Sequence, residues 1–254
     1  MSGPILEAQG LEKAFGGVKA VDGVSFTVEA GRLLALIGPN GAGKTTCFNL
    51  LNGQLRPDAG RVVMAGRDIT RLAPRTVWAL GVGRTFQITA TFSSMTVREN
   101  VQMALLSHHG KAWNVLGRAR DAFTAKADAL LGLVGIASQA ERACGVLAYG
   151  DLKRVELAVA LANAPKLLLM DEPTAGMSPG ERIALMELTA RIAREQSIAV
   201  LFTEHDMDVV FSHADRIIVL DRGRLIADGR AEEVRTNPAV QAVYLGTGTA
   251  FGAH

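Results

Sequence analysis

The chain has 254 residues, 48% of them hydrophobic, which is enough for one large domain or two small ones with a buried core. Its net charge of +2 is too small to indicate nucleic acid or an anionic membrane surface as a partner. No apolar run approaches the about 20 residues that cross a bilayer, and residues 1–9 lack the features of a secretion signal. The cysteines Cys47 and Cys144 indicate neither a metal site nor a disulfide framework, as is typical of a reducing compartment.

The first part of the chain predicts two kinds of strand. Residues 5–15 and 21–28 alternate apolar and polar side chains and predict strands of an antiparallel sheet, to which residues 61–64 add a short strand. Residues 33–37 form an unbroken apolar run bounded by glycines, which predicts a buried parallel strand. A helix is expected over residues 45–52.

The remainder predicts an α/β core interrupted by helices. Residues 82–86 predict a strand, and the pattern then becomes helical from 96 to 136, with a further helix over 151–163. Buried strands are expected next, with a helix between the first two of them, at 167–170, 179–194 (the helix), 198–203 and 217–220. The last residues, 246–254, are rich in Gly, Thr and Ala and are expected to fray.

Residues 38–45 lie between the buried strand and its helix and match G-x-x-x-x-G-K-[ST], the pattern of a phosphate-binding loop. Glycines let backbone N–H groups turn toward phosphate oxygens, and the helix adds the positive end of its dipole. Lys44 is expected to reach the β- and γ-phosphates and Thr45 to ligate Mg²⁺. A chance match has a probability of about 1% in a chain of this composition. The expected nucleotide-binding positions are Gly38, Pro39, Asn40, Gly41, Ala42, Gly43, Lys44, Thr45 and Thr46.

Acidic residues and a histidine follow two of the later strands. Asp171 and Glu172 end the apolar run 167–170, where Asp171 is expected to hold Mg²⁺ and Glu172 to act as general base on the attacking water. An ordinary helix N-cap is the alternative for this pair. His205 follows the run 198–203, and because ligands lie outside the carboxyl ends of parallel strands, it is expected to touch a γ-phosphate. His108, His109, His213 and His254 have no such placement.

One further motif resembles a known family. Before the predicted helix at 151 stands a segment that resembles the signature of ATP-binding-cassette (ABC) ATPases, commonly Leu-Ser-Gly-Gly-Gln, and it consists of Leu147, Ala148, Tyr149, Gly150 and Asp151. The resemblance implies an α/β P-loop NTPase (RecA-like) core with an N-terminal antiparallel β subdomain and a helical insertion. It also implies that two cassettes pair head to tail, with each ATP between the phosphate-binding loop of one and the signature of the other. A glycine turn with an Asp cap is the alternative interpretation.

The resemblance implies boundaries and further roles. We expect a single ABC ATPase domain over 5–246, with its core at about 5–88 and 161–230, a helical subdomain at about 89–160 and a C-terminal extension at about 231–254. Gln87 resembles the glutamine that senses Mg²⁺ and water, which makes it a metal-binding and catalytic candidate beside Lys44, Glu172 and His205. Phe15 resembles the aromatic residue that stacks on adenine, with a core aromatic as the rival interpretation. Residues 174–179 resemble the loop that crosses the dimer interface.

This chain departs from the family pattern at two positions. Ala148 stands where the signature usually has Ser, so a hydroxyl hydrogen bond to phosphate, worth about 1.5–3 kcal/mol, is lost. Ser178 stands where many cassettes have Asp, which puts carboxylate-mediated coupling between the two sites in doubt. Tyr149 in place of Gly is a common variation. The absence of an Asn-Lys-x-Asp guanine reader disfavours a GTPase, and the signature together with Glu172 disfavours a small-molecule kinase.

Within the family, several short sequence motifs are similar to those of the ATP-binding subunits of branched-chain amino-acid importers. Phrases that carry this resemblance are Phe-Gly-Gly-Val-Lys-Ala-Val from Phe15, Arg-Thr-Phe-Gln from Arg84, and Asn-Pro-Ala-Val from Asn237. Urea or amide importers and a lipopolysaccharide-export cassette share many of these motifs. A soluble ABC ATPase that remodels ribosomes or DNA and a non-hydrolysing nucleotide switch are the rivals from other classes.

The resemblance implies ATP and Mg²⁺ as cofactors, and a second cassette, in a homodimer or heterodimer, as a partner. It further implies permease subunits, indirectly a solute-binding protein, and no nucleic acid, with the cassette held peripherally at the cytoplasmic face of the inner or plasma membrane. Residues 89–100, which include the apolar Phe92 and Met95, are expected to form the docking groove for a permease helix. Burial within the helical insertion is the alternative for these side chains.

Overall fold

The computed structural model describes residues 3–85, 91–108 and 123–245, and its strands form two sheets within those ranges. The six-stranded sheet has the order β10-β9-β3-β8-β7-β6. Its parallel strands are β3 (Leu33–Ile37), β6 (Val82–Thr85), β7 (Leu167–Asp171), β8 (Ala199–Thr203) and β9 (Arg216–Asp221). At its edge β10 (Arg224–Gly229) runs antiparallel to β9.

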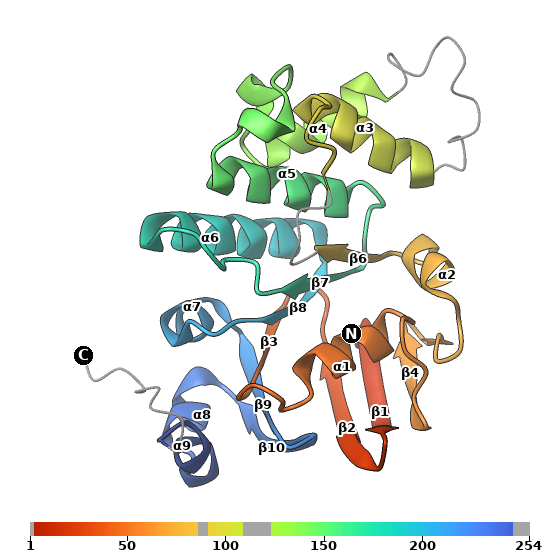
Figure 1. The fold of residues 1–254 in the computed structure, drawn as a ribbon, viewed down its shortest axis with the longest axis vertical. Coiled ribbons are helices and arrows are strands. Elements are labelled where there is room, and N and C mark those ends of the chain that lie inside the picture. Colours follow the sequence, from red (N-terminus) through yellow and green to blue (C-terminus); the bar gives the residue numbers. More distant parts are fainter. Residues whose placement is uncertain (1–2, 86–90, 109–122, 246–254) are drawn as a thin grey trace.

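The second sheet is antiparallel, with the order β2-β1-β4-β5, and lies at the opposite end of the molecule from the helices α3 (Val97–His108) and α4 (Thr124–Leu133) (Figure 1). Its strands are β1 (Leu6–Phe15), β2 (Val18–Val28), β4 (Ala59–Met64) and β5 (Arg67–Asp68). Gly16 and Gly17 form the turn between β1 and β2 with φ of 53° and 87°. A two-residue hairpin with both φ values positive matches the twist of the flanking strands and favours glycine.

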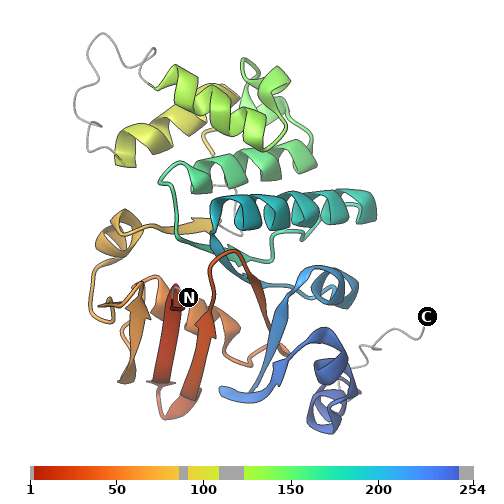
Figure 2. The same cartoon turned by 180° about the vertical axis from the view of Figure 1, so that it is seen from behind.

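Helices cover the six-stranded sheet in layers (Figures 1 and 2). The far end is formed by α3 (Val97–His108), α4 (Thr124–Leu133) and α5 (Tyr149–Leu161), which contact one another. Below them α6 (Pro179–Gln196) lies between this helical end and the sheet, next to α7 (Met207–His213). The remaining helices are α1 (Lys44–Leu51), α2 (Pro74–Ala79), α8 (Ala231–Thr236) and α9 (Pro238–Leu245), the last two packed on β9 and β10.

The central strands are apolar throughout because both faces of the sheet are covered. In β3, Leu33, Ala35 and Ile37 face the core shared with α3 to α9, whereas Leu34 and Leu36 face the core shared with α1 and the antiparallel sheet. This alternation follows from the two-residue repeat of a strand. It holds the end of β3, and the loop that follows it, between two packed layers.

The predicted strands and main helices are confirmed with small shifts of their ends. Within the predicted helical stretch 96–136, α3 and α4 are helices, and residues 109–122 lie outside the described residues, as does the predicted frayed end 246–254. The stretch is wrong at its end, because α4 stops at Leu133 and Gly135 takes a φ of 77°. The helix expected from 151 begins at Tyr149 and ends at Leu161. Short elements that sequence patterns did not predict are β5, β10, α2, α7, α8 and α9. In the described part of the chain no helix is both long enough and apolar enough to span a bilayer.

Candidate nucleotide-binding site

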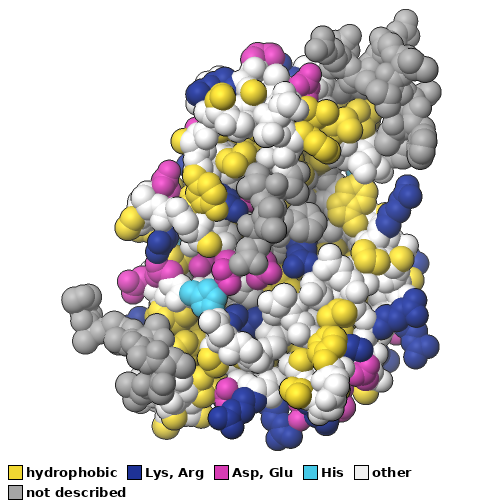
Figure 3. Space-filling model, viewed as in Figure 1, with side chains coloured by type: hydrophobic (Ala, Val, Ile, Leu, Met, Phe, Trp, Pro, Cys, Tyr) yellow, Lys and Arg dark blue, Asp and Glu magenta, His cyan; other side chains and the backbone are white. Residues whose placement is uncertain are grey.

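Three neighbouring parallel strands, β3, β7 and β8, end at the same edge of the sheet. Lys44, Asp171, Glu172 and His205 follow these ends, so the topology brings them together as the sequence predicts. On the face seen in Figure 3, acidic side chains gather midway between the helical end and the antiparallel sheet. The edge is therefore a polar site between two apolar cores.

The loop after β3 depends on glycine where other strands approach it. A Cβ on Gly38, which has a φ of 151°, would lie 2.2 Å from the carbonyl oxygen of Leu220 in β9. A Cβ on Gly43, which has a φ of 106°, would lie 2.2 Å from the carbonyl oxygen of Ala20 in β2. Gly41 has open space around it, with no atom within 4 Å of the same position. The loop is thus packed against both sheets at its ends and open at its middle, which suits a phosphate cradle.

Lys44 is the first residue of α1, and its side chain is buried. Its Nζ donates hydrogen bonds to the carbonyl oxygens of Gly38, at 2.6 Å, and Pro39, at 3.1 Å. Burial lowers the pKa of Lys44, while the nearby carboxylates of Glu172 and Asp171 act in the opposite direction. The ammonium group of Lys44 is therefore held by two carbonyl oxygens of the loop itself.

Asp171 ends β7 with a buried carboxylate that contacts Thr203 and Arg84 in the described part of the chain. Thr203 at the end of β8 donates from Oγ1 to Asp171 Oδ1 at 2.7 Å, and Arg84 Nη2 lies 3.5 Å from Oδ2. Sequence patterns did not indicate either neighbour. Thr203 could have been suspected because it ends the strand beside β7, but nothing in the sequence pairs Arg84 with Asp171.

Glu172 holds a strained backbone conformation, with a φ of 48°. Its N–H lies 3.1 Å from the carbonyl oxygen of Thr203 and 3.1 Å from Thr203 Oγ1, and these contacts retain the conformation. Non-glycine residues in the left-handed region cost about 1–3 kcal/mol and are concentrated at functional sites. Here the turn directs the Glu172 side chain toward His205.

Glu172 and His205 form a pair across the strand ends. Glu172 Oε1 lies 2.8 Å from His205 Nε2, and the side chains are 24% and 50% exposed, respectively. A histidine Nε2 that carries hydrogen donates to a carboxylate in such a contact and orients it. Both side chains are therefore partly exposed to solvent, and their mutual contact orients them.

Glu204, next to His205, was not singled out by the sequence. It is buried and accepts hydrogen bonds from the Thr174 N–H at 2.8 Å and from Thr174 Oγ1 at 2.7 Å. These bonds join the end of β8 to the loop 174–179. The two adjacent side chains thus make different contacts. Glu204 bonds to Thr174 in the loop, and His205 contacts Glu172.

The signature-like segment forms the start of α5. Ala148 is its N-cap, with φ of −62° and ψ of 151°, and both Ala148 and Tyr149 are exposed. A Cβ on Gly150 would lie 2.6 Å from Glu181 Oε1 in α6. Asp151 lies in the first turn of α5, so the alternative in which it caps the helix is wrong.

The loop 174–179 lies against this segment. A Cβ on Gly176 would lie 3.4 Å from the Tyr149 ring. Ser178 is the N-cap of α6, and Glu181 Oε2 accepts from its Oγ at 2.6 Å and from its N–H at 3.0 Å. Ser178, which stands in place of the common Asp, therefore has a structural role as a helix cap.

Of the two remaining site candidates, Phe15 and Gln87, only Phe15 lies among the described residues. Phe15 is 48% exposed at the end of β1, with Lys13 Nζ 5.7 Å from its ring centroid, so the interpretation as a core aromatic is wrong. Gln87 lies outside the described residues. The glycine cradle, the Lys44 cation and the Asp171 carboxylate fit a triphosphate with a divalent metal, as judged by their chemistry.

Family comparisons define the class of this protein. The ABC transporter family model matches residues 21–175, and a model for branched-chain amino acid ATP-binding cassette transporters matches residues 224–250. Together with the fold and the site, the first match makes the protein an ABC ATPase, which binds ATP and hydrolyses it for transport.

Individual relatives narrow this class. The chain is 40% identical to the high-affinity branched-chain amino acid transport ATP-binding protein BraF of Pseudomonas aeruginosa, over 97% of this chain and 99% of that protein. It is 37% identical to the corresponding protein LivG of Escherichia coli K12, again over 97% and 99%. The chain belongs to the branched-chain amino acid transport group of the ABC transporter family.

Solved structures agree with this assignment. The ADP conformation of an ATP-binding cassette of an ABC transporter aligns with a TM-score of 0.86 and 34% identity, over 96% of this chain and 99% of the other. A nucleotide-free cassette aligns with a TM-score of 0.85 and 33% identity, over 95% and 99%. The predicted fold class is confirmed.

Proposed function

We propose that this cassette uses ATP with Mg²⁺ at the edge of β3, β7 and β8 to energise import of branched-chain amino acids. The contact between Glu172 and His205, beside the buried Lys44 and Asp171, carries the catalytic part of this proposal. The relatives' transport names carry the substrate part.

Each side chain has a defined task in the proposed reaction. Lys44 exchanges the carbonyl oxygens of Gly38 and Pro39 for phosphate oxygens, to which the open middle of the loop gives access. Thr45 and Asp171 would hold Mg²⁺, whose charge offsets that of the phosphates, and Gln87 completes this set by resemblance. Phe15 offers an exposed ring for adenine.

Glu172 accepts the proton of the attacking water, because its carboxylate is partly exposed and held by His205. His205 keeps that carboxylate oriented and would touch the γ-phosphate. Glu204 and Thr174 tie the loop 174–179 to the same strand end. A change in the loop is thus transmitted to the residue next to His205.

A second copy of the cassette would complete each site. Ala148 and Tyr149 are exposed, and the N-terminus of α5 behind them offers backbone N–H groups to an anion. Because the signature of one chain would meet the phosphate-binding loop of the other, a two-fold dimer would contain two such sites. The loop 174–179 lies beside the signature and would share this interface.

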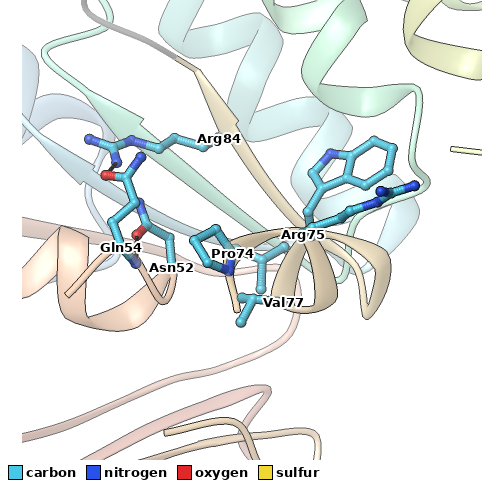
Figure 4. A pocket seen from close by; sticks show the side chains of 8 residues that line it. Asn52, Gln54, Pro74, Arg75, Val77 and Arg84 are labelled. Atoms are coloured by element: carbon cyan, nitrogen blue, oxygen red, sulfur yellow. Dashed lines mark hydrogen bonds between the residues drawn. The ribbon is translucent and has the colours of Figure 1, made fainter. Parts of the chain in front are cut away.

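We further propose that a cytoplasmic segment of the permease docks beside α2. A largely apolar pocket of about 290 Å³ lies there, with Pro74, Val77 and Trp78 in its lining and arginines at both ends (Figure 4). Phe92, in the predicted docking segment 89–100, is not among the residues that line this pocket, but its 56% exposure favours docking over burial for that segment's own side chain. By its family, this chain is a component of an ABC transporter complex with permease subunits, which supports a permease segment as the occupant.

Co-purification with the permease, followed by reconstitution in liposomes, tests the proposed function. ATPase activity should rise when leucine, isoleucine or valine is offered with the complex's solute-binding protein, and Glu172→Gln should abolish the rise. Stimulation by urea or amides instead would overturn the substrate part while leaving the ATPase part intact. Failure to associate with any membrane subunit would favour a soluble ABC ATPase.

A further inference from the structure

Arg84 in β6 joins three parts of the core through one guanidinium group. Its Nη1 donates to Asn49 Oδ1 in α1 at 3.0 Å and to Gln54 Oε1 after that helix at 2.9 Å. Its Nη2 lies 3.5 Å from Asp171 Oδ2, and the Arg84 and Asp171 side chains are only 15% and 11% exposed. The group therefore links the helix of the phosphate-binding loop to the proposed metal carboxylate.

This placement sets Arg84 in competition with a divalent cation. The Arg84 guanidinium is a cation, so Asp171 has a positive neighbour. Charges at this separation interact strongly when they are shielded from water. A metal ion that binds Asp171 has to overcome repulsion from Arg84 or displace it toward Asn49 and Gln54.

The same side chain forms part of the wall of the apolar pocket beside α2. Figure 4 shows the Arg84 and Gln54 side chains directed toward each other at one end of this pocket, with Arg75 extending at the other. Asn52 also lines the pocket, and its Nδ2 is buried without a hydrogen-bond partner in the described structure. Arg84, Gln54 and Asn52 thus share one end of the pocket, so an occupant of the pocket lies beside the residues that hold Arg84.

We propose that Arg84 is a positioning residue, which holds Asp171 in the metal-free cassette and lowers its metal affinity until the pocket beside α2 is filled. The proposal rests on the proposed role of Asp171 as the carboxylate that holds Mg²⁺. A filled pocket strengthens the hold of Gln54 and its neighbours on the guanidinium, which frees Asp171 for the metal. Permease docking and metal binding are thereby coupled through one side chain.

Binding of Mn²⁺, measured by electron paramagnetic resonance with saturating ADP, tests the first half on the isolated cassette. Arg84→Gln should tighten Mn²⁺ binding about fivefold to tenfold, because the competing charge is lost. Arg84→Lys, which keeps the charge, should stay close to the unmodified protein. Arg75→Gln removes an arginine from the opposite end of the same pocket and should leave Mn²⁺ affinity unchanged.

The outcomes separate this inference from the proposed site. If Asp171→Asn does not weaken Mn²⁺ binding, the assignment of Asp171 is wrong. If Asp171→Asn weakens it but Arg84→Gln has no effect, or matches Arg75→Gln, only the role of Arg84 is overturned. Thermal unfolding of each variant identifies loss of folding, and Arg84→Lys provides the charge-conserving variant should Arg84→Gln not fold.

The second half is tested with the co-purified permease complex in detergent as the probe. Mn²⁺ should bind more tightly, by a factor of about three or more, in the complex than in the isolated cassette. In Arg84→Gln the affinities with and without permease should converge. A difference that persists in Arg84→Gln would overturn coupling through this residue.

Discussion

Ala148 determines what the start of α5 can offer to a nucleotide. As the N-cap residue it has no side-chain acceptor for the first N–H groups of the helix, and it has no hydroxyl to donate to a phosphate. The missing group is the one that the family's usual serine supplies. In the proposed dimer, this one missing oxygen would affect both the local helix and the ATP bound by the partner subunit.

Ala148→Ser should therefore raise the ATP affinity or the turnover of the dimer. The same change should stabilise α5 by about 1 kcal/mol, since serine is a better N-cap than alanine. ATPase activity as a function of ATP concentration and thermal unfolding measure the two effects. Ala148→Gly adds no hydroxyl and is the matched control, and unchanged kinetics in Ala148→Ser would contradict the first expectation.

Glu172 is held by His205 and by the backbone contacts with Thr203, so its carboxylate has one orientation toward the site. Glu172→Gln keeps the shape and the contact with His205 but cannot accept a proton from water. Hydrolysis should fall about 100-fold or more, with ATP binding retained. Equilibrium binding and phosphate release distinguish these steps, and a variant that hydrolyses at the normal rate would exclude Glu172 as the base.

At the scale of elements, the register of β7 and β8 places Asp171 opposite Thr203, so the two strand ends are joined by a side-chain hydrogen bond. Beyond that point Glu204 fixes the loop that leads into α6, with two hydrogen bonds to Thr174. The loop ends at Ser178, the cap of α6, and its Gly176 lies beside Tyr149 of the signature. The hydrogen bonds between Glu204 and Thr174 are buried, whereas those between Ser178 and Glu181 at the cap are exposed.

Glu204→Ala should lower the free energy of unfolding by about 1–3 kcal/mol, because the Thr174 N–H is left buried without an acceptor. Denaturant unfolding measures the loss. Thr174→Ser retains both hydrogen bonds and should have a much smaller effect. Equal stability of Glu204→Ala and the unmodified protein would show that water replaces the carboxylate.

At the scale of the whole molecule, the exposed signature and the phosphate-binding loop belong to different parts of the fold. The signature lies at the start of α5 in the helical end, and the loop lies between the two sheets (Figure 2). In the proposed head-to-tail pair, the signature of one copy would meet the phosphate-binding loop of the other. ATP would then act as the link between two copies.

Glu172→Gln should consequently form a stable dimer with ATP, because hydrolysis no longer opens it. Light scattering coupled to gel filtration, with and without ATP, measures the change in mass. Lys44→Ala in the same background removes the phosphate contact and should remain monomeric. A monomer in both cases would show that the permease is required for pairing.

Local patterns within the sequence determined most of the fold. The apolar runs of β3, β7, β8 and β9 are short and bounded by breakers, so they identify buried strands without a template. The resemblance then related the loop 38–45, Asp171, Glu172 and His205 to one family. Elements such as α2, α8 and α9 escaped because they are short, and tertiary packing rather than local pattern stabilises them.

The sequence by itself determined the chemical groups of the site and the strand ends that carry them, since motif spacing and apolar periodicity are local properties. Only the tertiary structure decided which groups meet: Arg84 with Asp171, and Glu204 with Thr174. It also decided that Phe15 is exposed. These contacts join residues far apart in the chain, or depend on burial, and both are set by how the sheets and helices pack rather than by any short stretch of residues.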